Sequence, residues 1–465
     1  MMPYNQMNEI SLADAVRFVV DNRGKTAPTE KIGIPLIATN CISNAELYPT
    51  KERLRYVSDE IYANWFRAHP EPGDIILTNK GSQNGAVCLV PDPVDFCIAQ
   101  DMVALRADES KIDPLYLFAA LRSTLVQNRI KNLNVDAVIP HLKKTDFNKL
   151  FIPLPDKKTQ ETIGKFYFDF SVKIELNRQI NQTLEQIAQT IFKSWFVDFE
   201  PVKAKIAAKT AGHDPDRAAM CAISGKTAAE LDQLTAEQRQ QLAATAALFP
   251  DELVESELGL VPVGWSVSTL GKYCDILNGH AFKSKDYVTE GIFVFRTKNF
   301  SDSGYSERLS DDVFLPRTFC DSHSKFLCRP FDFHLVMVAA SIGKTAVIFP
   351  HHLPALRNQN MWCFRAKENF SSKIYLQHTV SRIVKELLGW ASGSARSFFR
   401  KGDFQQQMFL FPDSEILACF ENTALSTLNK ISTNNLESAK LSQLRDSMLP
   451  KLLSGELPPL IPPMK

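Results

Sequence analysis

The chain lacks several features that would define common classes of protein. No apolar run reaches about 18 residues, so no membrane-spanning helix is expected. The first residues lack the basic segment and apolar core of a signal peptide. Nine cysteines occur without a C-x-x-C pair, and an odd number without such pairs favours free thiols over disulfides or a zinc site. These absences predict a cytoplasmic protein.

The net charge is also close to zero, at +1 over 465 residues. A balanced charge gives the chain no general attraction to nucleic acid, so a DNA-binding surface would have to come from local clusters of basic side chains. A hydrophobic content of 45% in a chain of this length predicts two or three domains with their own cores.

Phosphate-loop motifs are incomplete. The Gly-Lys-Thr triplet at 343–345 needs a glycine five residues before Gly343, where the chain has Val338. The triplet at 225–227 fails in the same way, because Met220 stands at the corresponding position. We therefore expect no phosphate loop of the nucleotide-hydrolysing kind.

Other catalytic and metal-binding motifs are weak. Asp92, Glu109 and Lys111 have the residue types of a metal-dependent nuclease, but the segment ADESKIDP is typical of a surface turn. No Asn-Pro-Pro-aromatic tetrad of adenine methyltransferases occurs. His351 and His352 have no further ligands at metal-binding spacing. We expect no catalytic residues and no metal in this chain.

The most informative feature that is present is an internal repeat. Residues 135–156 match residues 392–413 at a constant separation of 257 positions, with a basic pair, Asp-Phe and Pro-Asp in the same order. Upstream matches at 258 to 259 include Pro72 with Pro330 and Asp74 with Asp332. A fixed long period defines the structural unit, which here is half of the chain.

Each repeat has the pattern of a mixed α/β domain. In the first, short apolar runs at 34–39, 74–78 and 86–90 lie between Gly, Pro and Asn and predict strands. Residues 113–130 have helical spacing, with Asp113 as a suitable N-cap and Pro114 at the first helical position.

Each repeat is followed by a long amphipathic segment with a seven-residue period, in which most of the repeating positions are apolar. Both segments predict long helices of coiled-coil type, the second ending at Pro450. Two such helices in one chain can bury each other's apolar stripe, and the chain order favours antiparallel packing in a dumbbell with approximate two-fold symmetry. Asn177 and Asn434 fall at equivalent seam positions, where they form either a polar layer that fixes the register or the wet edge of the seam.

Several segments resemble the specificity subunit of type I restriction–modification enzymes. The segment 173–205, KIELNRQINQTLEQIAQTIFKSWFVDFEPVKAK, is similar to the first spacer helix of that family, and 441–457 is similar to the second. Residues 249–265 resemble the approach to the second target-recognition domain, and 277–300 and 341–349 resemble motifs inside such domains. The resemblance covers nearly the whole chain, and its helical segments are the most specific part.

The resemblance implies both a fold and a function. It implies two mixed α/β target-recognition domains joined by two antiparallel helices, with each domain reading half of a bipartite DNA site. It also implies two methyltransferase subunits as partners and two restriction subunits in the full complex. S-adenosylmethionine, ATP and magnesium would be bound by those partners, with no cofactor in this chain. The predicted divisions are a first recognition domain at 1–155, a spacer helix at 156–201, a helical linker at 202–262, a second recognition domain at 263–412, a second spacer helix at 413–452 and a Pro-rich tail at 453–465.

Polar and basic clusters in the loops of both repeats are the candidate DNA contacts. Arg, Lys, Asn and Gln can read base edges, and Lys also binds phosphates. For any single residue, a solvated loop is an equally good interpretation. The candidates are Arg23, Lys25, Asn79, Lys80, Gln83, Asn84, His141, Lys143 and Lys144 in the first repeat, and His280, Lys283, Lys285, Arg296, Lys298, Asn299, Lys344, Arg396, Arg400 and Lys401 in the second.

Two other functions remain open on the sequence. A stand-alone DNA-modifying enzyme is opposed by the missing motifs. A coiled-coil scaffold that binds only protein would be distinguished by a gel shift with a random duplex library in the presence of a methyltransferase partner. The aromatic residues of SWFVDFEPVKAK fit either a partner-docking surface, which we favour, or a cap on the helix core.

Overall fold

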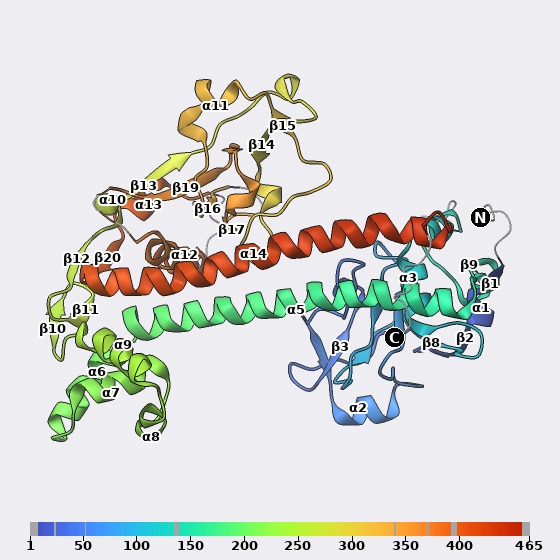
Figure 1. The fold of residues 1–465 in the computed structure, drawn as a ribbon, viewed down its shortest axis with the longest axis horizontal. Helices are drawn as coiled ribbons and strands as arrows, with labels where there is room; N and C mark the ends of the chain where they lie inside the picture. Colours follow the sequence, from blue (N-terminus) through green and yellow to red (C-terminus); the bar gives the residue numbers. More distant parts are fainter. Residues whose placement is uncertain are drawn as a thin grey trace. The chain divides into compact units, whose positions relative to one another are not determined.

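The computed structural model describes residues 8–457 except 23–24, 52, 134–138, 339–340, 369, 371 and 392–397. The chain forms two compact units. Unit 1 comprises Met1–Gln179 with Asn435–Lys465, and unit 2 comprises Ile180–Asn434. Both units combine small β-sheets with helices, so the predicted mixed α/β class is confirmed (Figure 1).

The described residues of unit 1 form three sheets. A four-stranded antiparallel sheet has the order β2-β8-β5-β6, a three-stranded sheet has the order β4-β3-β7, and β1 pairs with β9. The strands are β1 (Glu9–Ser11), β2 (Val16–Val20), β3 (Ile34–Ile37), β4 (Arg55–Val57), β5 (Ile75–Thr78), β6 (Val87–Leu89), β7 (Cys97–Ile98), β8 (Met102–Ala107) and β9 (Phe151–Pro153). The helices are α1 (Leu12–Ala15), α2 (Asp59–Asn64), α3 (Pro114–Arg122) and α4 (Thr124–Asn132), with 3-10 turns η2 (Thr39–Cys41) and η3 (Lys144–Lys149).

Strand β5 shows why its sequence contains an unbroken apolar run. Successive side chains of a strand point to opposite faces. Ile75 and Leu77 therefore join the core that includes α3, while Ile76 joins a second core on the other face of the sheet. Since both faces are covered, the run cannot alternate with polar residues.

The helix predicted at 113–130 is two helices in the structure. Asp113 caps α3 as predicted, with its carboxylate accepting from the amide of Tyr116 at 2.8 Å. The helical path breaks at Ser123, whose backbone is extended and whose hydroxyl accepts from the amide of Val126. A serine that caps a new helix competes with continuation of the old one, and the apolar spacing alone does not reveal this.

Unit 2 repeats the topology of unit 1. Its sheets have the orders β13-β19-β16-β17, β15-β14-β18 and β12-β20, which match those of unit 1 strand for strand. The strands are β12 (Ser266–Thr269), β13 (Cys274–Asn278), β14 (Ile292–Phe295), β15 (Phe314–Leu315), β16 (Phe333–Val336), β17 (Thr345–Val347), β18 (Ala355–Arg357), β19 (Met361–Ala366) and β20 (Met408–Phe411). The helices are α10 (Leu270–Tyr273), α11 (Phe319–Ser322), α12 (Lys373–Ala391) and α13 (Lys401–Gln405), with turns η4 (Ser284–Asp286), η5 (Thr297–Asn299), η6 (Ser324–Phe326) and η7 (Pro350–His352). The internal repeat is thus confirmed as a repeat of fold.

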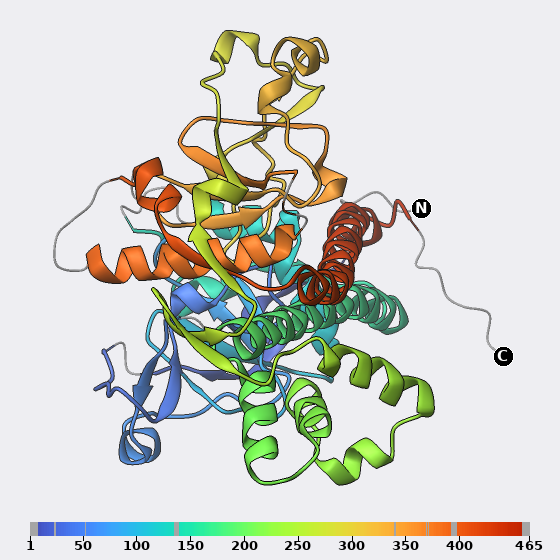
Figure 2. The ribbon, with the colours of Figure 1, turned by 90° about the vertical axis from the view of Figure 1, so that its left-hand side faces the viewer.

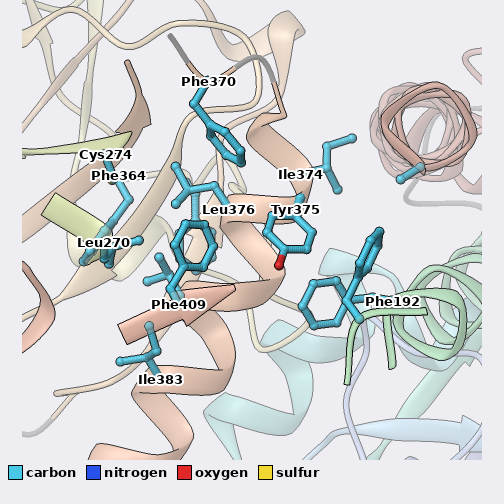
Figure 3. Close-up of a cluster of buried hydrophobic side chains, with 14 of the residues drawn as sticks. Phe192, Leu270, Cys274, Phe364, Phe370, Ile374, Tyr375, Leu376, Ile383 and Phe409 are labelled. Atoms are coloured by element: carbon cyan, nitrogen blue, oxygen red, sulfur yellow. The ribbon is translucent and has the colours of Figure 1, made fainter. Parts of the chain in front are cut away.

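The core of unit 2 is rich in aromatic side chains. Phe192 packs beside Tyr375 of α12, with 5.5 Å between the ring centroids (Figure 3). Trp195 and Phe196 are also buried there, next to Phe249 and Phe420. These two aromatic residues of the SWFVDFEPVKAK segment therefore belong to the core. This agrees with the alternative interpretation, a cap on the helix core, and not with the favoured docking surface.

A helical insert follows the first long helix. It consists of α6 (Glu200–Thr210), α7 (Pro215–Ser224), α8 (Ala228–Asp232) and α9 (Ala236–Ala247), which Figure 2 shows as one group in light green. It continues into an antiparallel hairpin of β10 (Leu253–Ser256) and β11 (Gly259–Pro262). The segment predicted as a helical linker therefore ends in strands, because the two-residue turn of Glu257 and Leu258 lies between short β-forming runs.

The two long helices are α5 (Lys157–Phe196) and α14 (Ser414–Leu453), each of 40 residues. Pro450 lies inside α14, so the predicted end at Pro450 is wrong. Proline removes one backbone donor near the helix end, whereas Leu449, Leu452 and Leu453 are buried in the core of unit 1. This burial stabilises the last turn. The Pro-rich tail from 458 onward lies outside the described residues.

The two helices run antiparallel within each unit. In unit 1, Asn177 donates to Glu437 at 2.8 Å and to Ser438 at 3.2 Å, and Arg445 donates to Ser171 at 3.1 Å. In unit 2, Asn434 donates to Asn181 at 2.9 Å. Asn177 and Asn434 are 1% and 2% exposed, so they form a buried polar layer and not the wet edge of the seam. No helix among the described residues is long and apolar enough to cross a membrane.

Candidate DNA interface

In unit 1 the structure brings two candidate clusters together. The turn after β5 lies beside the segment leading to η3, with Lys80 bridged to His141 in the backbone. The backbone amide of Leu142 donates to the carbonyl of Asn79 at 2.8 Å and to the side-chain oxygen of Asn84 at 3.4 Å. These residues are about 60 positions apart in sequence, and they form one polar surface.

The lysines of this surface have different environments. Lys80 lies 3.6 Å from Asp101, and Lys144 lies 2.5 Å from Asp21, with both lysine side chains more than 40% exposed. Exposed ion pairs of this kind contribute little to stability, so a phosphate can replace the carboxylate. Lys143 and Lys25 are exposed, as is Gln83 in the turn, whereas Arg23 lies outside the described residues.

In unit 2 a cluster of phenylalanine and histidine rings lies around His280, close in sequence to two lysines. His280 lies 4.9 Å from Phe282, 4.8 Å from Phe326 and 5.1 Å from His323, measured between ring centroids. Burial lowers the pKa of His280, with smaller contributions from His323 and Lys325. The exposed side chains of Lys283 and Lys285 stand beside this group in the chain. Sequence reasoning missed His323 and Lys325, because they lie about 40 residues away and only the fold brings them near.

The loop at 296–299 is bound to the segment at 311–312. Arg296 donates to the carbonyl of Asp311 at 2.8 Å, and Lys298 pairs with the carboxylate of Asp311. Asn299 is fully buried and donates to Asp312 at 2.6 Å. A buried amide held in this way positions the loop and does not present its edge to a base. The prediction of Asn299 as a DNA contact is therefore corrected, and its role is structural.

The remaining candidates of unit 2 are more varied. Lys344 pairs with Asp302 at 2.8 Å. The ammonium of Lys401 donates to the carbonyl of Ile276 at 2.5 Å, and burial lowers its pKa. Arg400 is exposed, with its guanidinium carbon 5.6 Å from the ring of Phe398. Arg396 lies outside the described residues.

The weak catalytic motifs have ordinary structural roles. Lys111 pairs with Asp108 at 3.1 Å, and the carbonyl of Glu109 accepts from Lys157. Asp92 precedes a cis proline in the connection from β6 to β7.

The adjacent histidines contact hydroxyl groups. His351 lies 3.3 Å from the hydroxyl of Ser432, and His352 lies 2.7 Å from that of Ser306. Burial lowers the pKa of His352 to about 3.

One buried group of metal-ligand types was not predicted. Asp332, His334 and Cys363 offer donor atoms within 4.8 Å of one another. The Asp332 carboxylate is bound by Arg365, and His334 contacts the carbonyl of Asp332 at 3.1 Å. Burial lowers the pKa of His334 to about 4 and raises that of Cys363. A cation here would face a guanidinium and would need a thiolate that burial disfavours, so we interpret the group as a buried polar network.

The chain thus consists of two repeated α/β units with polar loops, each followed by a long helix. Residues 22–186 match the family model described as the type I restriction modification DNA specificity domain. The resemblance to the specificity subunit of type I restriction–modification enzymes, first indicated by the helical segments, is confirmed.

Two curated relatives and one solved structure extend this likeness over most of the chain. The HindI specificity subunit of Haemophilus influenzae is 29% identical over 403 residues, covering 83% of this chain and 86% of the relative. The MjaIX specificity subunit of Methanocaldococcus jannaschii is 22% identical over 445 residues, covering 93% and 90%. The structure of a type I restriction–modification S subunit from M. genitalium aligns with a TM-score of 0.54 and 15% identity, covering 97% of this chain and 99% of that one. This structural likeness concerns the fold.

Proposed function

We propose that the chain is the DNA-specificity subunit of a type I restriction–modification complex. Each repeat reads one half of a bipartite site, and the paired helices set the gap between the halves. The chain directs adenine methylation or restriction that partner subunits carry out. The curated relatives are named as specificity subunits of such enzymes, and this supports the assignment.

The observation that carries the two-module proposal is the way each repeat closes on itself. Strand β1 pairs with β9, and β12 pairs with β20, so the first and last strands of each repeat are neighbours. A segment whose ends meet keeps most of its contacts internal and behaves as an exchangeable module. Each closing strand leads directly into a long helix, α5 or α14.

The proposed DNA contacts are the polar loops of the two units. In unit 1 they are the turn after β5 and the segment before η3, with Lys25. In unit 2 they are the region of His280 with Lys283 and Lys285, the surface of Arg296 and Lys298, Lys344, and the basic pair Arg400 and Lys401 at the start of α13. Phosphate contacts fix the position of a protein on DNA, and contacts to base edges give specificity. Asn299 is left out of this set because it is buried.

The chain itself is proposed to be non-catalytic. Two methyltransferase subunits would supply S-adenosylmethionine chemistry, and two restriction subunits would bind ATP and magnesium. An assay of the pure chain with DNA, magnesium, ATP and S-adenosylmethionine tests this directly. Cleavage or methylation that disappears in Asp92→Ala or Glu109→Ala would show a catalytic chain and reject the proposal.

A domain exchange tests the modular reading. Residues 265–412 are replaced by the equivalent domain of another specificity subunit, and methylated sites are mapped in a host that expresses the methyltransferase partner. One half of the modified site should change while the other half remains. A change in both halves would contradict one module per half-site, and binding of the partner without any DNA selectivity would favour the scaffold alternative.

A further inference from the structure

In unit 1 the loop before β5 places two carboxylates on one guanidinium. The Nε of Arg106 lies 2.9 Å from Oδ1 of Asp74, and its Nη1 lies 2.8 Å from Oε1 of Glu71. A guanidinium presents a planar fork of donors that suits such paired acceptors. Arg106 is therefore neutralised on two edges.

Unit 2 contains the same turn, and its hydrogen bonds are equivalent to those of unit 1. The Asp332 carboxylate accepts from the amide of Arg329 at 2.7 Å, as that of Asp74 accepts from the amide of Glu71 at 2.8 Å. The amide of Asp332 donates back to the carbonyl of Arg329, as that of Asp74 does to Glu71. Arg365 binds Asp332 through its Nε at 3.1 Å. Arg329 therefore occupies the structural position of Glu71.

The exchange of Glu71 for Arg329 reverses the charge beside the Asp–Arg pair that both repeats contain. Where unit 1 has the carboxylate of Glu71, unit 2 has a second guanidinium. Lys373, the first residue of α12, adds a third cation, and the corresponding first residue of α3 is Pro114. Among the described residues that line this region, Asp332 supplies one carboxylate against three cations.

A cavity opens beside Arg329, the residue at the position of Glu71. It has a volume of about 380 Å³, which is within the range of small-ligand sites. Its cationic lining is Arg329, Arg365 and Lys373, and its apolar walls include Phe364 and Phe370, both labelled in Figure 3. Lys373 lies 5.2 Å from the ring of Phe331 and interacts electrostatically with Glu421, which is also bound by Ser372 and the amide of Ile374.

We propose that this cavity binds a phosphate group. The phosphate takes the place of the missing carboxylate and accepts hydrogen bonds from Arg329 and Arg365, with Lys373 as the third cation. Phosphate oxygens suit guanidinium forks, and a half-enclosed site strengthens the interaction over that in water. The phosphate comes either from the backbone of duplex DNA or from a free phosphorylated molecule.

The test compares thermal unfolding of the full chain in phosphate and in chloride at equal ionic strength. Phosphate should raise the melting temperature of the wild type with a saturable dependence, because a ligand of the folded state stabilises it by mass action. Arg329→Glu restores the carboxylate seen in unit 1, so it should keep the fold and weaken phosphate binding by at least about tenfold. Lys226→Glu is the control, since it makes the same change of charge on the helical insert.

An equal phosphate response in Arg329→Glu and the wild type would overturn the site. A response lost equally in Lys226→Glu would also overturn it, because the effect would then come from net charge alone. If Arg329→Glu does not fold, Arg329→Gln serves as the second variant with the same expectation.

DNA binding by the chain together with its methyltransferase partner then separates the two sources. For a DNA phosphate, Arg329→Glu lowers the dependence of log affinity on log salt by about one, and free phosphate competes with the duplex. For a free phosphorylated molecule, the salt dependence stays unchanged while the phosphate-induced rise in melting temperature is lost. Both results support the phosphate site and differ only in what fills it.

Discussion

The hydroxyl of Tyr116 donates a hydrogen bond of 2.7 Å to the carbonyl of Pro153. The same bond recurs in unit 2, where Tyr375 donates to the carbonyl of Leu410 at 2.7 Å. In each unit the bond joins the first helix after the central sheet to the last strand, and both tyrosines are buried. The repeat is thus preserved at the level of single buried contacts.

We expect Tyr116→Phe and Tyr375→Phe to destabilise their units by similar amounts, about 1 kcal/mol each, because each change removes the buried hydrogen bond to the last strand at nearly constant volume. Urea unfolding followed separately for the two units, through reporters placed in each, measures the effect. A loss in only one of the two variants would show that the contacts are not equivalent.

A second prediction concerns the contact between α3 and α5. A Cβ on Gly164 would lie 2.5 Å from the backbone nitrogen of Tyr116 and 2.9 Å from a carboxylate oxygen of Asp113. Because backbone atoms cannot yield as a flexible side chain does, Gly164→Ala should force the helices apart and cost about 2 kcal/mol or more. The melting temperature of the full chain should fall accordingly.

Gly402→Ala is the matched control, since nothing lies within 4 Å of its added Cβ. It should be neutral or slightly stabilising, because alanine favours a helix over glycine. The position equivalent to Gly164 is Glu421, which accepts hydrogen bonds from Ser372 and from the amide of Ile374 at the start of α12. A similar fall in melting temperature for Gly164→Ala and Gly402→Ala would contradict the argument that α3 and α5 approach closely at Gly164.

A third prediction follows from His334. Its pKa is lowered from 6.5 to about 4 by burial, so the unfolded chain binds more protons than the folded one between these values. The stability that depends on neutral His334 is complete above pH 6.5 and is lost as the pH falls toward 4, at roughly 1 kcal/mol per pH unit.

Denaturation midpoints measured from pH 7 to 4.5 should show this loss, and His334→Gln should flatten it by about one proton. His213→Gln is the control, because His213 is exposed. If stability falls as steeply toward pH 4.5 in His334→Gln as in the wild type, the loss of stability comes from other titrating groups.

A fourth prediction concerns the lysines beside His280. Lys283→Ala should weaken binding to all duplexes alike and lower the dependence of log affinity on log salt by about one, as expected for a phosphate contact. Binding is measured with the methyltransferase partner present, and Lys203→Ala on the helical insert serves as the control. A change confined to one base position would make Lys283 a base-reading residue instead.

The pattern of the sequence predicts the repeat, the class of fold and the polar layer of the long helices, because these depend on periodicity and order along the chain. It does not predict the break at Ser123 or the passage of α14 through Pro450, since local preference there is overridden by capping and by burial of the last turn. Nor does it separate Asn299, which is buried, from its exposed neighbour Lys298.

The site residues His323 and Lys325 were missed for a similar reason, because contacts between distant parts of the chain decide where they lie. Whether a polar side chain faces solvent is decided by partners far away in sequence, as Asp312 decides it for Asn299. The charge reversal at Arg329 is readable from the repeat alone, once Glu71 is aligned with it. Its meaning requires the structure, which shows that Glu71 binds Arg106 and that a cavity accompanies the reversal.

The last prediction concerns the role of the long helices as a spacer. Seven residues inserted after Gln179, at the boundary of the two units, add two helical turns, or about 10 Å, and preserve the apolar face. At about 3.4 Å per base-pair step, the gap in the recognised site should lengthen by up to about three base pairs. Both half-sites should stay the same, because the inserted residues touch neither recognition module. Methylation mapping in the host measures gap and half-sites together. The same seven residues inserted between α7 and α8, after Gly225, should leave the gap unchanged, since that loop belongs to the helical insert. A lengthened helix with an unchanged gap and an altered half-site would show that α5 does not set the spacing.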